Sequence, residues 1–529
     1  MADLLITNGT VVDGTGNPGY RAAVAIEGDT LRIVRGTREL PEAQRTIDAT
    51  GLTVCPGFFD LHSHSALIVQ SEPDHFPKVQ QGVTTEVIGI DGNSYAPFKT
   101  REQLTSFVRM YAGLDGHPDD IAYDWDSTAS LLRKYDRRTS VNIATMVGNA
   151  ALRLSVVGWD MIPATPGHIA DMKAMLREAM QEGAFGLSTG LDYPPGSYAS
   201  TDELIELAQA AGEFGGFYHT HLRNTLGDRF LDPIREAVTI CRRGELPLHL
   251  THLFHRANSP YGAQRIFDLI TEAQGGGVEV TFDSYPYEWG STTAIIKLPQ
   301  WAQEGGPEAT VDRLTDTEVR ERIRKDIAAR TSYAAWIRSM DYVRLGHFSQ
   351  PSLLRYEGLT LGEIVRTEQR DAVDVFCDIL VAERLAINEV APGPWPVTLA
   401  KFVTHPEGMV GTDSIFLGDK PSPRTYGAYP RILGDLVREE KLMSLAEAIR
   451  KMTSYPAQRL GVLDRGILRD GLKADVTIFD FNTIRPVGTY DDPRHQCEGV
   501  HYVINNGVLV IDQGVHTGAH PGRALRRKY

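Results

Sequence analysis

Eight short apolar runs typical of strands, separated by stretches of helical periodicity, constrain the fold of this 529-residue chain. Alternation of strand and helix is typical of a parallel β/α architecture. The runs are residues 54–62, 83–89, 141–148, 184–188, 216–221, 246–252, 278–285 and 409–413. After the fourth run, residues 202–214 have the apolar spacing of an amphipathic helix, with Ser200 and Thr201 placed to cap it. We therefore expect an α/β fold, a (β/α)8 (TIM) barrel, with its active site where the strands end.

Both ends of the chain differ from the barrel pattern. Residues 3–50 and 466–515 contain short strand-like runs broken by turn dipeptides. The dipeptides are Asn8-Gly9, Asp13-Gly14 and Asn506-Gly507. We expect residues 1–52 and 455–529 to form together one small β-sandwich domain.

The predicted barrel domain, residues 53–454, contains a long insertion. Residues 287–408 lie between the seventh and eighth strands and far exceed the usual connection of a few residues. Long loops at that face of a barrel usually touch the substrate, which favours a lid over the site. The alternative is that the insertion packs on itself and that its aromatic residues fill a small core of their own.

The composition excludes several classes of partner. The net charge of −14 at pH 7 is unsuited to nucleic acid, which needs a basic face. No run approaches the roughly 18 apolar residues of a membrane span, and the first residues lack the basic and apolar regions of a secretory signal. We expect a cytoplasmic protein without nucleic-acid or membrane partners, whose four widely spaced cysteines stay reduced.

Four histidines and one aspartate at the ends of predicted strands form a candidate metal site. His62 and His64 follow the first strand and, two residues apart on an extended chain, point to the same side. The fifth, sixth and eighth strands end in His221, His252 and Asp413. Because the strand ends meet at one rim of a barrel, these side chains are predicted to bind a divalent metal. The alternative is separate buried histidines that form core hydrogen bonds.

A metal at this position suits the hydrolysis of an amide bond. A divalent ion lowers the pKa of bound water from about 15.7 toward 7 and polarises a carbonyl. Asp413 is predicted to be the catalytic base, which takes the proton of that water and delivers it to the leaving nitrogen. Tyr193 and Tyr285 are candidates for hydrogen bonds to the substrate, or are simply walls of the pocket.

Six segments narrow the interpretation. They are residues 186–196, 221–224, 283–287, 423–427, 466–475 and 521–523. Their motifs resemble those of the amidohydrolase superfamily and, within it, the N-acyl-D-amino-acid deacylase (D-aminoacylase) family. The resemblance implies zinc held by His221 and His252. It also implies a second, often weaker, metal position at His62, His64 and Asp413.

The chain departs from the family pattern after the second strand. The family has a cysteine ligand there in a Gly-Asn-Cys-Gly motif, and Asp91 occupies the cysteine's place. A carboxylate also binds or bridges divalent ions and is harder than a thiolate. Asp91 is therefore predicted to ligate one or two ions, zinc first, with manganese or cobalt as alternatives. The alternative role for Asp91 is a loop carboxylate bonded to the backbone.

A second departure from the family pattern affects the position that usually binds the carboxylate of the substrate. The family usually has a lysine two residues after the sixth-strand histidine, and Phe254 stands there. Arg223, Arg256 or an arginine of the insertion could replace the lysine; alternatively, the substrate has no free carboxylate at that point. Tyr285 and Ser291 match family positions near the substrate. The predicted substrate-binding residues are Tyr193, Arg223, Tyr285 and Ser291.

Three functions are compatible with these residues. The leading one is hydrolysis of a linear amide in a small molecule, as in the deacylation of N-acyl-D-amino acids. A cyclic-amide hydrolase of the hydantoinase or dihydroorotase kind uses the same barrel and would explain Phe254. A non-catalytic barrel scaffold is disfavoured, because the rim ligands are all present. The sequence leaves the exact substrate, the stereochemistry and a homo-oligomeric state open.

Overall fold

The computed structural model describes residues 1–36, 39–224, 230–329 and 339–528. It confirms the (β/α)8 barrel, whose parallel strands overlap the eight predicted runs. The ring closes after the last strand, where the Asp413 N–H donates to His62 O at 2.8 Å and the His64 N–H to Ser414 O at 3.1 Å. The strands are β8 (Phe58–Asp60), β9 (Val83–Ile88), β10 and β11 (Asn142–Thr145 and Val147–Gly148), β12 (Gly186–Gly190), β13 (Phe217–His221), β14 (Leu248–Leu250), β15 (Val280–Ser284) and β19 (Gly408–Val410).

Helices cover the outside of the barrel. The predicted helix is α8 (Thr201–Gly212), which begins where Ser200 Oγ accepts the Glu203 N–H at 3.1 Å. Its buried leucines and alanines join a core shared with the neighbouring helices and with β12 to β15. The other helices around the barrel are α3 (Arg101–Met110), α5 (Thr128–Tyr135), α6 (Asn149–Val156), α7 (Pro166–Gln181), α9 (Asp232–Gly244), α10 (Ala263–Gly275), α16 (Arg424–Arg431), α17 (Leu445–Met452) and α18 (Ser454–Leu460).

The first predicted strand, residues 54–62, divides into two. β7 (Thr53–Pro56) pairs with β20 (Val476–Phe479) outside the barrel, and only β8 enters the barrel. Gly57 lies at the division, where a Cβ atom would come 2.2 Å from Thr84 Oγ1. No residue with a side chain fits so close an approach. The chain therefore changes sheets at a glycine.

Both ends of the chain build the β-sandwich, whose two sheets share an apolar core. One sheet has the order β5-β4-β1-β6 and the other β23-β22-β21-β20-β7-β2-β3. Asn506 and Gly507 join β21 to β22 with φ of 49° and 80°, as both central positions of a type I′ turn require. The remaining strands are β1 (Ala2–Thr7), β2 (Thr10–Val11), β3 (Tyr20–Arg21), β4 (Ala23–Glu27), β5 (Thr30–Val34), β6 (Ala43–Asp48), β21 (Val500–Asn505), β22 (Val508–Asp512) and β23 (Val515–His516).

The observed boundary between the two units differs from the expected limits at 52 and 455. β7 belongs to the sandwich, whereas α18 packs Ala457 and Leu460 against the barrel core at Phe59. The last described residues also return to the barrel, where the Ile143 N–H donates to Arg523 O at 2.9 Å. Strand pairing and apolar contacts, which the sequence pattern did not reveal, set these limits.

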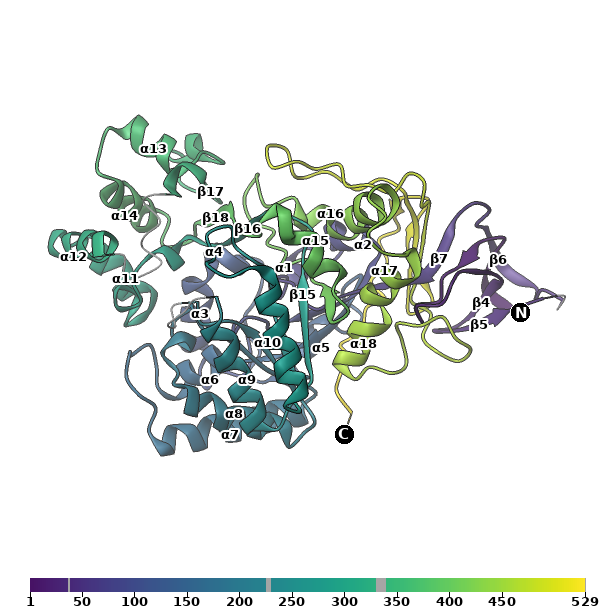
Figure 1. Cartoon of the computed structure of the whole chain (residues 1–529), viewed down its shortest axis with the longest axis horizontal. Coiled ribbons are helices and arrows are strands. Elements are labelled where there is room, and N and C mark those ends of the chain that lie inside the picture. The colour runs from purple at the N-terminus through teal and green to yellow at the C-terminus, as the bar shows by residue number, and fades with distance from the viewer. Residues whose placement is uncertain (37–38, 225–229, 330–338, 529) are drawn as a thin grey trace.

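The insertion, residues 287–408, has an inner sheet and an outer group of helices. The sheet has the order β16-β18-β17, with β16 (Trp289–Thr293), β17 (Arg344–Gly346) and β18 (Asn388–Pro392). The outer helices are α11 (Gly306–Leu314), α12 (Thr317–Ala329), α13 (Leu361–Glu368) and α14 (Ala372–Ala382). The last helix, α15 (Pro396–Thr404), packs against the barrel strands β15 and β19. Figure 1 shows α11 to α14 at one end of the molecule and the sandwich at the other. The inner sheet lines the pocket described below, and the outer helices bury residues such as Ile364 and Phe376.

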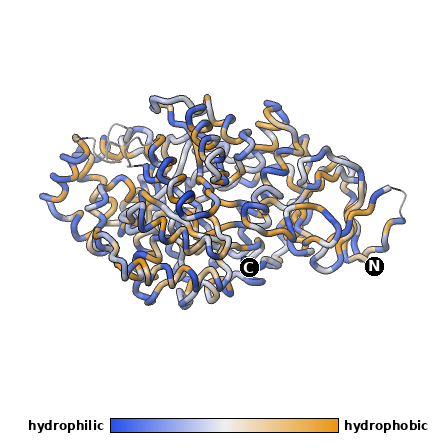
Figure 2. The backbone as a smooth tube through the Cα atoms, turned by 60° about the horizontal axis from the view of Figure 1, so that its bottom comes forward, coloured by the Kyte–Doolittle hydropathy of each residue, from blue (hydrophilic) through white to orange (hydrophobic). Residues whose placement is uncertain are grey.

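No described helix combines the length and apolar content needed to cross a membrane. Figure 2 shows short hydrophobic and hydrophilic stretches alternating along the chain. All four cysteines are free thiols, as expected, and three of them are buried.

Candidate metal centre and adjoining pocket

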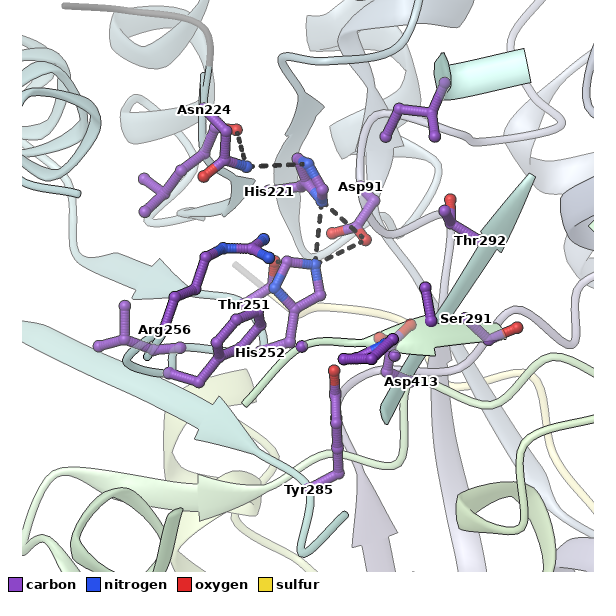
Figure 3. A pocket seen from close by; sticks show the side chains of 18 of the residues that line it. Asp91, His221, Asn224, Thr251, His252, Arg256, Tyr285, Ser291, Thr292 and Asp413 are labelled. Atoms are coloured by element: carbon purple, nitrogen blue, oxygen red, sulfur yellow. Dashed lines mark hydrogen bonds and ion pairs between the residues drawn. The ribbon is translucent and has the colours of Figure 1, made fainter. Parts of the chain in front are cut away.

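The carboxylate of Asp91 lies at the centre of a cluster of four histidines. Its Oδ2 is 3.2 Å from His62 Nε2 and 3.8 Å from His64 Nε2. The same oxygen is 3.6 Å from His252 Nε2 and 3.8 Å from His221 Nδ1. Figure 3 shows Asp91 facing His221 and His252 at the edge of the pocket. A single carboxylate oxygen therefore adjoins every predicted histidine ligand.

The ligand atoms form two groups that share Asp91. One group is His62, His64, Asp91 and Asp413, and the other is Asp91, His221 and His252; within each, the ligand atoms lie within 4.8 Å of one another. Asp413 Oδ1 is 3.4 Å from Nε2 of both His62 and His64. The structure thus brings together all six residues predicted to ligate metal.

Three of these residues have a strained backbone. The φ angles of Asp91, His252 and Asp413 are 51°, 34° and 48°, in the left-handed region that residues with a side chain seldom adopt. Each residue follows the end of a barrel strand and turns its side chain toward the cluster. Strain of this kind concentrates at functional sites, where the surroundings hold it in place.

Three of the histidines have a carboxylate on the nitrogen that faces away from Asp91. The pairs are His62 Nδ1 with Asp283 Oδ1 at 3.2 Å, His64 Nδ1 with Asp115 Oδ1 at 2.8 Å, and His221 Nε2 with Asp192 Oδ2 at 2.9 Å. A carboxylate on the outer nitrogen fixes the ring and leaves the inner nitrogen to a metal.

Asp283 also connects the two ligand groups. Its Oδ1 accepts the backbone N–H of His252 at 2.8 Å, and its Oδ2 lies 3.0 Å from His249 Nε2. Sequence reasoning missed the roles of Asp115, Asp192 and Asp283. The position of Asp283 at the end of the seventh strand was a usable signal, because that strand ends at the same rim.

The cluster has the charge and the donor atoms that a divalent cation needs. Burial alone would lower the pKa of His64, but Asp115 and Asp413 raise it to about 9. Burial raises the pKa of Asp91, yet His62 and His252 hold it well below its ordinary value. The carboxylates therefore favour a positive charge on the histidines. In addition, Asp91 Oδ1 is buried without a hydrogen-bond partner among the described residues. Imidazole nitrogens with carboxylate oxygens suit zinc, manganese or cobalt, so the residues present fit a divalent ion.

A pocket opens beside the cluster and contains three of the four predicted substrate residues, Tyr193, Tyr285 and Ser291. The Tyr193 ring lies 4.9 Å from the His221 ring, and its hydroxyl is 2.8 Å from Thr292 Oγ1. Figure 3 shows the Tyr285 hydroxyl directed toward Asp413. Ser291 Oγ donates to Asn388 Oδ1 at 2.9 Å.

The prediction for Arg223, the fourth residue, is not supported. Its Nε lies 3.1 Å from Glu236 Oε2, and its two terminal nitrogens donate to the carbonyls of Ser197 and Ala199. It is absent from the pocket lining, and Glu236, which holds it, lies on α9.

Arg256 lines the pocket, and its guanidinium lies 4.8 Å from the centre of the Phe254 ring. Among the described residues of the insertion, no arginine lines the pocket, whereas Lys297 does.

Arg424 is a further buried cation that sequence reasoning missed. Its Nη2 lies 2.8 Å from Asp413 Oδ2 and donates to Ser291 O at 3.2 Å. The guanidinium stands 4.4 Å from the centre of the Tyr285 ring. Its position in the segment 423–427, already singled out as a motif, was the available signal.

Comparison with known proteins gives consistent matches over most or nearly all of the chain. The model of the "Amidohydrolase family" matches residues 45–511. The chain is 31% identical to D-aminoacylase of Alcaligenes xylosoxydans xylosoxydans, over 99% of this chain and 98% of that one. It is 30% identical to N-acyl-D-aspartate deacylase of the same organism, over 99% and 95%. The solved N-acyl-D-glutamate deacylase of Bordetella bronchiseptica, complexed with zinc and a phosphonate inhibitor, superposes with a TM-score of 0.83 at 28% identity, covering 99% of this chain and 100% of that one.

Proposed function

The chain belongs to the amidohydrolase family, and from this premise we propose that it hydrolyses the amide bond of N-acyl-D-amino acids. The reaction depends on a divalent metal. The observation that carries the proposal is the position of Asp91 Oδ2 between two groups of histidines, beside Asp413 and next to a pocket.

We assign two metal positions that share Asp91. His62, His64 and Asp413 complete one, and His221 and His252 complete the other. A bound ion supplies acidity to a water molecule and polarises the scissile carbonyl. Zinc is the proposed ion, with manganese or cobalt as alternatives, and either one or both positions are filled. The carboxylates on the outer nitrogens hold the histidine rings in the orientation that this assignment needs.

Asp413 acts as the general base and acid. Its carboxylate accepts a proton from the attacking water and delivers it to the leaving nitrogen. Burial raises the pKa of Asp413, but Arg424 and His62 lower it to about 2, so the carboxylate is ionised at neutral pH and able to accept the proton. Its place in the pocket lining supports contact with the substrate.

Arg256 is the proposed partner of the substrate carboxylate. Phe254 stands where the family usually has a lysine, and its ring supports the Arg256 guanidinium at the pocket wall. Tyr285 and Ser291 also line the pocket and carry hydroxyl groups. Tyr193 packs against His221 and bounds the pocket near the metal ligands.

The proposal is tested by hydrolysis assays on the protein loaded with zinc or manganese. N-acyl-D-amino acids are compared with their L enantiomers, with the matching carboxamides, and with hydantoin and dihydroorotate. We expect turnover of N-acyl-D-amino acids above all others. Turnover confined to the cyclic amides would replace this function with the rival one, and no turnover of any amide would refute both.

The role of Asp413 has its own variant. Asp413→Asn keeps the size of the side chain and leaves the Asp91, His221 and His252 group intact. We expect a folded protein that retains metal and loses about 10²- to 10⁴-fold in kcat. Near wild-type turnover would refute the assignment of the base.

We also propose that the protein is cytoplasmic and that its partner is the small-molecule amide itself. The net charge of −14 accords with this proposal. Fractionation of the cells that make the protein tests the location.

A further inference from the structure

A buried ion pair lies in the pocket wall, apart from the proposed metal ligands. Lys297 Nζ is 2.9 Å from Glu389 Oε1, and the two side chains are only 12% and 4% exposed. Both residues line the pocket. The second carboxylate oxygen, Glu389 Oε2, is buried and has no hydrogen-bond partner within the described part of the chain. A buried carboxylate oxygen without a donor is costly unless a ligand supplies one.

Neighbouring side chains connect the ion pair to the metal ligands. Glu389 on β18 stands opposite Thr292 on β16, and side chains directly opposite in an antiparallel pair share a face. Thr292 Oγ1 lies 2.8 Å from the Tyr193 hydroxyl, and the Tyr193 ring packs against His221. A continuous row of side chains therefore leads from a metal ligand to Glu389.

The pocket that the pair lines has apolar as well as polar side chains. The lining includes Phe254, Ile266 and Ile296. Burial raises the pKa of Glu389, and Lys297 offsets part of that effect. The pair carries no net charge when both groups are ionised, so it attracts few ions over a long range. At close range, each of the two charges repels a ligand group of the same sign.

We propose that Glu389 selects the side chain of the substrate, and that it favours an N-acyl-D-amino acid whose side chain ends in a neutral carboxamide over one that ends in a carboxylate. This inference rests on the proposed function. The N–H of a carboxamide satisfies Glu389 Oε2. A carboxylate would face the negative charge of Glu389, and a cationic side chain would face Lys297.

Sequence similarity to known deacylases does not show which substrate side chain this protein prefers. Its identity to the D-aminoacylase and to the N-acyl-D-aspartate deacylase is 31% and 30%. The pocket is where the difference in side-chain preference must be encoded. The Glu389 carboxylate argues against an acidic substrate.

The test compares N-acetyl-D-glutamine with N-acetyl-D-glutamate, which differ in one terminal atom and in charge. Wild-type protein is expected to favour the glutamine compound in kcat/KM by about tenfold or more. Glu389→Gln removes the negative charge beside Lys297, so the preference should shift toward glutamate by about tenfold or more. Lys297→Met is the matched control, because it keeps Glu389 and should disfavour glutamate further. A structural defect alone would lower kcat/KM for both substrates together and would not invert the ratio of the two values.

Equilibrium binding separates this inference from the proposed function. The zinc-loaded Asp413→Asn protein is titrated with each compound by calorimetry, so that preference is measured without turnover. Tighter binding of N-acetyl-D-glutamine by about tenfold supports the inference even if wild-type protein hydrolyses no N-acyl-D-amino acid, which would refute only the proposed function. Equal binding, tighter binding of glutamate or no binding of either compound overturns the inference, whatever the turnover.

Discussion

Arg424 Nη2 lies 2.8 Å from Asp413 Oδ2, and the two side chains are 0% and 7% exposed. The buried guanidinium therefore holds one oxygen of the proposed base, while Asp413 Oδ1 faces His62 and His64. Arg424 Nε and Nη1 are buried and have no hydrogen-bond partner among the described residues. The contact with Asp413 fixes the orientation and the charge of that carboxylate.

Arg424→Gln should reduce kcat/KM by about 100-fold, because a misplaced base loses much of the contribution of proton transfer. Arg424 lowers the pKa of Asp413, so its removal raises that pKa. Asp413 works in its deprotonated form, and the acid limb of the pH profile should therefore move to higher pH.

Arg431→Gln is the control for Arg424→Gln. Arg431 ends the same helix and pairs with Glu288, 2.9 Å away, outside the ligand cluster. Its variant should keep the wild-type pH profile. An unchanged profile and rate in Arg424→Gln would contradict the positioning role.

Asp283→Asn should weaken metal binding by about 10- to 100-fold, the usual loss when the partner of a ligand histidine is changed. The carboxylate faces His62 Nδ1 and accepts the His252 N–H, so both ligand groups depend on it. The metal retained after dialysis against a series of chelator concentrations measures the effect, with circular dichroism to verify the fold.

Asp136→Asn serves as the control for Asp283→Asn, since Asp136 lies at an exposed helix end away from the cluster. Metal retention in Asp283→Asn equal to that of the control would contradict the role of Asp283.

Removal of the metal should lower the melting temperature. The cluster holds Asp91 and Asp413 among buried groups, and a bound cation stabilises the folded state only. At a free zinc concentration 100 times Kd, the stabilisation is about 2.7 kcal/mol. Differential scanning calorimetry with and without a chelator measures the shift. Identical melting temperatures would indicate that no metal binds the folded protein.

The sequence predicted the barrel and the cluster because both follow from periodicity. Side chains two residues apart on a strand share a side, and parallel barrel strands end at one rim. This periodicity was enough to predict four of the proposed ligands from the sequence, namely His62, His64, His221 and His252. The family pattern added Asp91 through the position of a missing cysteine.

The rest depended on contacts between elements distant in the chain. Asp115 reaches His64 from a short helical turn with no periodic signal. Arg223 looked available for a substrate but is held by Glu236 of the following helix. The Lys297–Glu389 pair joins two parts of the insertion 92 residues apart, a pairing that only the fold of the inner sheet reveals.

The central claim is that Asp91 is a metal ligand of an amide hydrolase, and zinc content together with turnover tests it most directly. Zinc per chain is measured by mass spectrometry on dialysed wild-type, Asp91→Ala and Asp91→Cys proteins, and the hydrolysis of an N-acyl-D-amino acid is assayed on the same samples. We expect Asp91→Ala to lose zinc and most turnover. Asp91→Cys should retain zinc and lose activity with manganese, because a thiolate is softer than a carboxylate. Wild-type zinc content and turnover in Asp91→Ala would contradict the account.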